Sequence, residues 1–250
     1  MVRRERDDAI VWVVLDRPDR RNALNRAMVE ALRRALLEAD ADPETQVIAV
    51  RGEGPDFCAG GDLAEIRRLA EEDVFLNLDD ADALADLFLL PRRLRKPVAA
   101  VVHGRALAGG CGLATACDLV LAAETAEFGY PEVHLGFVPA MVLALLRRHV
   151  GEKAAFALVA FGDRLSATEA QRLGLVTATL PADDFVDRAR ETLRRLASRS
   201  AAALRLLKRV FYLQDGLPLE AAVHAGADIN VMARLTDDAR AGMQRFLERT

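Results

Sequence analysis

The sequence predicts an α/β core followed by a region made of helices only. Strand-like and helix-like patterns alternate over residues 1–182, whereas residues 183–250 carry helix-like patterns throughout. The chain has 250 residues, 52% of them hydrophobic, which suffices for a sizeable core and is too apolar for a disordered chain. We therefore expect a core region at 1–182 and a helical region at 183–250.

Apolar runs and turn residues predict the elements of the first half. A short apolar or β-branched run ended by Gly, Pro or Asp indicates a strand, and apolar residues spaced by three and four behind a capping side chain indicate a helix. The polar stretch from Glu71 to Asp80 is expected to be mobile. The predicted elements are a strand at 9–15, a helix capped by Asn25 and running to about Ala39, a strand at 46–50, helices at 63–69 and 84–94, and a strand at 98–102.

Similar patterns predict the remaining elements. Ala106 to Ala116 is rich in small residues and suits a buried helix, and a helix follows Pro139. Ser166-Ala-Thr-Glu169 has the form of a capping box, which predicts a short helix that ends at Gly174. We further expect a strand at 119–122 and helices at 185–196, 201–213, 219–232 and 237–247.

The composition excludes several classes of function. A formal net charge of −4 provides no positive surplus for nucleic acid. The longest apolar stretches, 106–117 and 137–146, are shorter than the roughly 18 residues that cross a membrane, and the N-terminus has no apolar signal core. The three cysteines have no metal-ligand spacing to the histidines, and their odd number indicates reduced thiols. We expect a cytoplasmic protein with no metal, no nucleic-acid partner and no membrane segment.

The sequence lacks the motifs of several common enzyme classes. Gly52-Glu-Gly54 follows a strand, but Phe57 stands where a dinucleotide-binding loop needs its third glycine. The chain has no Gly-x-Ser-x-Gly, no Gly-Lys-Ser/Thr and no His-Glu-x-x-His. A Rossmann enzyme, a serine hydrolase, a P-loop enzyme and a zinc protease are therefore disfavoured.

Two glycine-containing junctions remain, at Phe57-Cys-Ala-Gly-Gly-Asp-Leu63 and Val102-His-Gly-Arg-Ala-Leu-Ala-Gly-Gly-Cys-Gly-Leu113. Each leads from a strand into a helix, where unpaired amide N–H groups carry partial positive charge and glycine lets a ligand approach the backbone. Two such amides aimed at one oxygen would form an oxyanion hole. Taken singly, each junction can also be an ordinary tight turn.

Further segments accompany the two junctions in a fixed order along the chain. Together with Thr236 to Phe246 near the chain end, the segments are Leu15-Asp-Arg-Pro18, Arg21-Asn-Ala-Leu24, Phe57 to Leu63, Ala106 to Ala114, Ala116-Cys-Asp-Leu119 and Phe128 to Gly136. In the order of these motifs the sequence resembles the enoyl-CoA hydratase/isomerase (crotonase) superfamily. The resemblance implies a spiral of β-β-α units, a helical C-terminal oligomerisation region, a homotrimer or dimer of trimers, and an acyl-CoA thioester as substrate.

The resemblance also implies roles for individual residues. The amides of Gly61 and Gly109 would hold the thioester oxygen as it becomes an enolate, and Glu132 would be the acid/base. No separate cofactor is implied, because CoA is part of the substrate. Arg245 and Arg249 could reach a neighbouring subunit's CoA or merely complement a helix dipole. The implied substrate and CoA contacts are Arg20, Arg21, Ala23, Leu24, Ala59, Asp62, Leu63 and Gly110.

Two departures leave the reaction open. Hydratases similar to this chain commonly carry a second glutamate where Gly112 stands, and a Gly-rich stretch where this chain has Pro139-Ala-Met-Val-Leu-Ala144. Enoyl-CoA hydration is the leading interpretation and isomerisation of 3-enoyl-CoA to 2-enoyl-CoA by Glu132 alone is the runner-up. A CoA-binding member without activity and an acyl-CoA hydrolase are further alternatives.

Four other polar side chains near the junctions are interpreted as structural. His103 and His134 border the expected cleft, and a hydrogen-bonded structural histidine is commoner than a catalytic one. Cys58 and Cys111 lie beside the implied oxyanion positions, but nothing in the sequence around them would make a thiolate.

Overall fold

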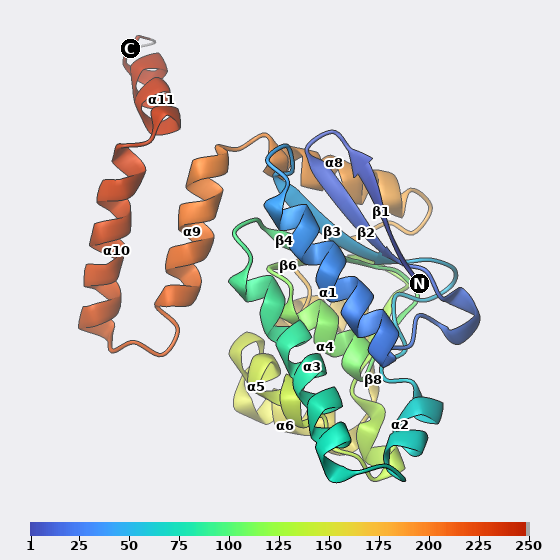
Figure 1. Ribbon diagram of the computed structural model, residues 1–250. Coiled ribbons are helices and arrows are strands. Elements are labelled where there is room, and N and C mark those ends of the chain that lie inside the picture. The colour runs from blue at the N-terminus through green and yellow to red at the C-terminus, as the bar shows by residue number, and fades with distance from the viewer. Residues whose placement is uncertain (249–250) are drawn as a thin grey trace.

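A computed structural model describes residues 1–248 and shows an α/β core with a helical arm (Figure 1). The main sheet has six strands, parallel except for the pair β1 and β2, and a second sheet has three. The order in the main sheet is β1 (Val2–Asp7), β2 (Ile10–Leu15), β3 (Val47–Gly52), β4 (Val98–Val102), β6 (Leu119–Ala123) and β9 (Ala178–Leu180). The second sheet is β5 (Arg105–Leu107), β7 (Glu127–Gly129) and β8 (Arg164–Ser166).

The middle of the main sheet is apolar on both faces. Every residue of β2 and β4 is buried, which explains their uninterrupted apolar runs. Strand β1 differs because it is a charged edge strand, and charge on an edge discourages pairing with another chain. For this reason the sequence predicts no strand at β1, since its pattern of charges is unlike that of a buried strand.

Helices cover both faces of the main sheet. Figure 1 shows α1 (Arg26–Ala41) in front of the sheet and α8 (Phe185–Ala197) behind it. The predicted caps are confirmed: the Asn25 side chain accepts from Met28 N at 2.9 Å. Ser166 and Glu169 form the predicted capping box. The other core helices are α2 (Leu63–Leu69), α3 (Val74–Arg93), α4 (Gly109–Ala116), α5 (Ala140–His149), α6 (Glu152–Phe161) and α7 (Ala167–Leu173).

The segment from Glu71 to Asp80, expected to be mobile, contains the start of α3 at Val74. The Asp73 side chain caps the helix by accepting from Phe75 N at 2.8 Å. The Asn77 side chain donates to the Leu69 carbonyl at 2.7 Å and ties the new helix to the end of α2. Polar residues here therefore serve as caps and connections.

Three helices form the C-terminal arm: α9 (Ala201–Leu213), α10 (Leu219–Arg234) and α11 (Asp237–Leu247). Helix α9 is joined to the core by two hydrogen bonds of 2.6 Å, from Lys208 Nζ and from the Tyr212 hydroxyl to the Asp118 carboxylate. Figure 1 shows α10 and α11 standing away from the sheets. Their exposed apolar side chains include Leu219, Val223, Val231, Met232, Met243 and Leu247.

The division at residue 182 stays a prediction. Helix α8 lies after it but packs against β2, β3 and β9, whereas α10 packs against α9 and α11. Nowhere in residues 1–248 is there a helix both long and apolar enough to cross a bilayer. Arg249, which the sequence analysis considered for CoA, lies outside the described residues.

Candidate active site

The two glycine-containing junctions lie side by side. Cys58 pairs with Ala106 in an isolated parallel bridge, and Leu107 N donates to the Cys58 carbonyl at 3.0 Å. The backbones touch where glycine allows it: a β-carbon built on Gly110 would lie 2.2 Å from the Cys58 carbonyl oxygen. A β-carbon on Gly60, whose φ is +97°, would lie 2.7 Å from Ala108 Cβ. Small residues are therefore needed to bring the two segments together.

This packing brings the amides of Gly61 and Gly109 close together. A β-carbon on Gly109 would lie 3.8 Å from Gly61 N. Leu24 bridges to Gly61 through the Gly60 carbonyl and the Asp62 amide, which turns the Gly61 N–H away from Leu24. Gly109 is the first residue of α4, where an N–H has no partner inside the helix. Within residues 1–248, nothing accepts a hydrogen bond from either amide.

The residue before Gly109 has an unusual backbone conformation. Ala108 has φ +50° and ψ −127°, a region that normally needs glycine. Its amide donates to the Gly129 carbonyl at 2.8 Å, which continues the pairing of β5 with β7. The strained residue thus joins the start of α4 to the segment that leads to Glu132.

Glu132 lies in a 3₁₀ turn, Pro131–Leu135, three residues after Gly129. Its side chain is half-buried, and its Oε2 atom is fully buried with no hydrogen-bond partner among residues 1–248. Burial raises the pKa of the carboxyl above its usual value of 4.5. A buried carboxyl with a raised pKa and a free oxygen is suited to accepting and returning a proton.

The position of the missing second glutamate is closed. A β-carbon on Gly112 would lie 2.1 Å from Val142 Cγ1 and 3.4 Å from Phe88 Cζ. Val142 belongs to α5, in the apolar stretch that follows Pro139. The two departures noted in the sequence are therefore one contact, in which Val142 fills the space beside Gly112.

The match to known proteins decides the family. The model of the enoyl-CoA hydratase/isomerase family matches residues 5–250. The chain belongs to this family. It is 36% identical over 255 residues to the Mycobacterium bovis protein named "Probable enoyl-CoA hydratase echA8", with 98% of this chain and 94% of that one covered.

Two further comparisons agree. The 2,3-dehydroadipyl-CoA hydratase of Escherichia coli K12 is 33% identical over 245 residues, covering 98% of this chain and 94% of its own. The crystal structure of an enoyl-CoA hydratase from Mycobacterium smegmatis superposes with a TM-score of 0.95 at 31% identity, covering 99% of this chain and 96% of that one. The predicted crotonase fold is confirmed.

The residues that the resemblance implies as substrate and CoA contacts of this hydratase/isomerase family member differ in their exposure and in their contacts. Arg20 and Arg21 are exposed at the turn Pro18–Arg20, and neither forms an ion pair within the described chain. Ala23 and Leu24 are buried. The other implied contacts are Ala59, whose amide donates to the Arg21 carbonyl at 3.0 Å, exposed Leu63, and Gly110, packed on Cys58.

Asp62 is occupied by contacts within the chain. Its Oδ1 accepts from Ala64 N at 3.1 Å and caps α2, and its Oδ2 pairs with Arg17 Nη1 at 2.8 Å. Burial alone would raise the pKa of this carboxyl, but Arg17 and the capping amides hold the pKa below its usual value. The structure therefore shows Asp62 fixing the helix that follows Gly61.

The histidines and cysteines near the site have structural contacts. His103 Nε2 lies 2.7 Å from the Gly54 carbonyl, and His134 Nε2 lies 2.9 Å from the Phe161 carbonyl. Burial raises the pKa of the Cys58 thiol to about 12 and that of Cys111 to about 11. A thiol with such a pKa stays protonated and is a poor nucleophile.

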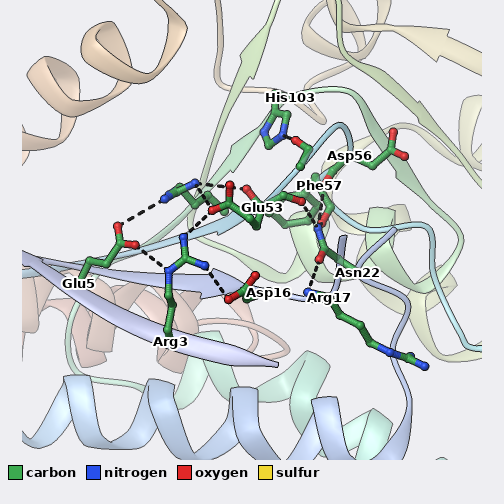
Figure 2. Close-up of polar contacts among 12 residues, drawn as sticks. Arg3, Glu5, Asp16, Arg17, Asn22, Glu53, Asp56, Phe57 and His103 are labelled. Carbon is green, nitrogen blue, oxygen red and sulfur yellow. Dashed lines mark hydrogen bonds and ion pairs between the residues drawn. The ribbon is translucent and has the colours of Figure 1, made fainter. Parts of the chain in front are cut away.

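Asn22 is a buried residue to which the sequence analysis gave no role. Figure 2 shows its side-chain amide against the loop that precedes the first junction, where it donates to three carbonyls at 2.9–3.1 Å. Its Oδ1 accepts from Arg17 N at 2.9 Å, and its φ is +55°. The one available signal was that Asn tolerates the left-handed conformation better than most residues. The carbonyls belong to Glu53, Asp56 and Phe57.

A cavity of about 550 Å³ lies at the carboxyl ends of β3, β4 and β6. It is lined by the loop after β3, by His103 and Gly104, and by the start of α8. Gly61, Gly109 and Glu132 do not line this cavity. The candidate site is thus defined by its amides and carboxylate.

Proposed function

We propose that the protein is an enoyl-CoA hydratase that uses Glu132 as its only acid/base. The observation that carries this proposal is the free, buried Glu132 oxygen. Glu132 lies three residues after Gly129, whose carbonyl accepts a hydrogen bond from Ala108, the residue before Gly109. The name of the Escherichia coli relative, a 2,3-dehydroadipyl-CoA hydratase, supports a thioester with a conjugated double bond as substrate.

In the proposed reaction the amides of Gly61 and Gly109 donate to the thioester oxygen. Glu132 takes a proton from water, the water oxygen bonds to C3, and the C2–C3 π electrons move to give an enolate. The carboxyl then returns the proton to C2, which completes the addition of water. Negative charge develops on the thioester oxygen, where one oxyanion-hole donor contributes roughly 2.7 to 4 kcal/mol. Backbone donors do not titrate, and no cofactor beyond the substrate's CoA is needed.

The test follows the conjugated-thioester absorbance of a 2-enoyl-CoA. Wild-type protein should abolish this absorbance, and Glu132→Gln should slow the loss about 100-fold or more. Glu127→Gln is the matched control, because Glu127 is partly exposed on β7 and pairs with Arg164 at 2.9 Å. Full activity in Glu132→Gln would overturn the role of this residue.

A second candidate is isomerisation of a 3-enoyl-CoA, which the contact between Val142 and Gly112 favours. An isomerase needs one base that removes a proton from C2 and returns it to C4, and Val142 leaves no space for a side chain at 112. Conversion of 3-enoyl-CoA to the conjugated thioester, with 2-enoyl-CoA left unhydrated, would establish this activity. Calorimetric binding of acyl-CoA without turnover of either would show a non-catalytic member, and release of free thiol a hydrolase.

We further propose that the chain assembles as a homotrimer or a dimer of trimers through its helical arm. Leu219 and Val223 of α10 are 82% and 62% exposed, a poor arrangement for an isolated chain. Phe211 of α9 is 67% exposed and adds to the apolar surface of the arm.

The exposed Arg20 and Arg21 are proposed to contact the CoA phosphates, since guanidinium groups fit phosphate oxygens.

A further inference from the structure

Asp56 and Arg105 form a partly buried ion pair with two hydrogen bonds, in the segments that lead to the candidate site. Arg105 Nε lies 2.7 Å from Asp56 Oδ1, and Nη2 lies 2.7 Å from Oδ2. The Arg105 amide also donates to Oδ1 at 3.1 Å. The Asp56 side chain is 2% exposed and that of Arg105 is 29% exposed. Both oxygens of the Asp56 carboxylate therefore accept hydrogen bonds from the same residue, Arg105.

The pair connects the two junctions. Asp56 precedes Gly61 by five residues and Arg105 precedes Gly109 by four. Beyond the pair, Cys58 N donates to the Arg105 carbonyl at 3.1 Å, so the two segments run together toward the two amides. The Asp56 main-chain carbonyl in turn accepts a hydrogen bond of 2.9 Å from the Asn22 side chain.

We infer that the Asp56–Arg105 pair positions the Gly61 and Gly109 amides relative to each other. The inference rests on the proposed function, because it concerns the two amides assigned to the thioester oxygen. Arg105 is a positioning residue, acting through the backbone that it begins. A guanidinium bound through two nitrogens fixes both the separation and the orientation of its partner, whereas a lysine would fix only the separation.

Electrostatics explains why the pair persists at neutral pH. Burial alone would raise the pKa of Asp56, but the hydrogen bonds and charge of Arg105 outweigh burial and keep the pKa below its usual value. The side-chain hydrogen bond with Asp56 in turn raises the pKa of Arg105. Both partners therefore stay charged throughout the neutral range.

The experiment compares Arg105→Met and Arg105→Lys with a control pair at the other end of the strands. Arg95→Met is the control, because Arg95 Nε pairs with buried Asp40 at 3.1 Å before the start of β4. Each protein is assayed for kcat and KM with a 2-enoyl-CoA. Each is also mixed with 4-(dimethylamino)cinnamoyl-CoA, a thioester whose absorption moves to the red when its carbonyl is polarised. Amide hydrogen exchange of segments 57–63 and 106–112 provides a readout independent of activity.

We expect Arg105→Met to lower kcat about 10- to 100-fold with KM changed less than about threefold, because small displacements of catalytic groups have effects of this size. The red shift should fall by about half or more, and exchange in both segments should accelerate. Arg105→Lys should lie between Arg105→Met and wild type, and Arg95→Met should match wild type in all three measurements.

The inference is overturned if folded Arg105→Met and Arg105→Lys keep the wild-type red shift, kcat and exchange rates. It is also overturned if Arg95→Met changes all three to the same extent, since the effect would then be general. Failure of the proposed function has another signature, a wild-type protein that neither turns over the 2-enoyl-CoA nor shifts the chromophore. The exchange rates would still decide whether the pair orders the two segments.

Discussion

Val142 packs against the α-carbon of Gly112 so closely that a β-carbon there would lie 2.1 Å from Val142 Cγ1. The contact joins α4 to α5 and explains two departures from the hydratase pattern at once. A glutamate at 112 and a valine at 142 exclude each other. Of the two glutamates common in similar hydratases, the contact between α4 and α5 therefore leaves space only for Glu132.

This contact makes Gly112→Ala destabilising, although alanine is the better helix former. We expect the free energy of unfolding to fall by about 1 to 3 kcal/mol from overpacking, and expect most of this loss to disappear in the background Val142→Ala. Gly242→Ala in α11 is the matched control, because nothing lies within 4 Å of its β-carbon. It should stabilise the helix by up to about 1 kcal/mol. Urea unfolding measures all variants, and an unchanged cost of Gly112→Ala in the Val142→Ala background would contradict the clash.

The raised pKa of Glu132 predicts a pH-dependent stability. The folded protein holds this proton more tightly than the unfolded chain, whose pKa is near 4.5. The stabilisation is therefore complete below about pH 4.5 and is lost as the pH rises through the folded-state pKa. Glu132→Gln should gain stability relative to wild type across this window and keep a constant difference above it. Urea titrations from about pH 4 to pH 8 test this, and a difference that is flat or shrinks with pH would contradict the shift.

The same carboxyl predicts the acid limb of the activity profile. Glu132 must be ionised to accept the first proton, so kcat/KM should fall below a pH that lies above 4.5. Rates measured with a 2-enoyl-CoA over the same pH range check this. An acid limb centred at or below 4.5 would argue against Glu132 as the base.

The backbone strain at Ala108 predicts a stabilising substitution next to the site. Glycine adopts φ +50° freely, so Ala108→Gly should raise the free energy of unfolding by about 1 kcal/mol. Ala106→Gly is the control two residues earlier, in regular strand β5, where glycine should lower stability by about 0.5 to 1 kcal/mol. Thermal unfolding of both variants tests this prediction. A destabilised Ala108→Gly would show that the surroundings relieve the strain.

The apolar arm predicts which substitutions should dissociate the proposed oligomer. Sedimentation of the wild type should give about three or six times the 27.3 kDa of one chain. Leu219→Glu combined with Val223→Glu should yield single chains with the core still folded, because these side chains lie on the exposed arm. Glu220→Ala on the same helix should leave the mass unchanged. A wild-type protein that sediments as a single chain would disprove the assembly.

Sequence patterns predict the helices and strands that are marked by neighbouring residues in the chain. Leu63–Leu69, Val98–Val102 and Asp237–Leu247 have the predicted bounds, since each combines a cap or turn residue with regular apolar spacing. Helix α6 was missed because its run Ala-Ala-Phe-Ala-Leu-Val-Ala is apolar on every side and has no period to detect.

The residues of the candidate site also differ in whether the sequence predicts them. The two glycine junctions and Glu132 stand out in sequence because they belong to short motifs. Asn22 and the Asp56–Arg105 pair act through contacts between distant parts of the sequence, and the residues around them predict none of these contacts. The contact of Val142 with Gly112 likewise depends on how α4 and α5 pack, which no local pattern predicts.

The two proposed oxyanion donors are main-chain groups, and this affects how such a site can evolve. A substitution at Gly61 or Gly109 changes the side chain but leaves the amide in place, so the donors are inherited together with the fold. Glu132, in contrast, can be lost through a single codon change. Mutation can therefore redirect the acid/base chemistry many times while the polarising amides persist, which makes the fold a durable platform for new reactions of thioesters.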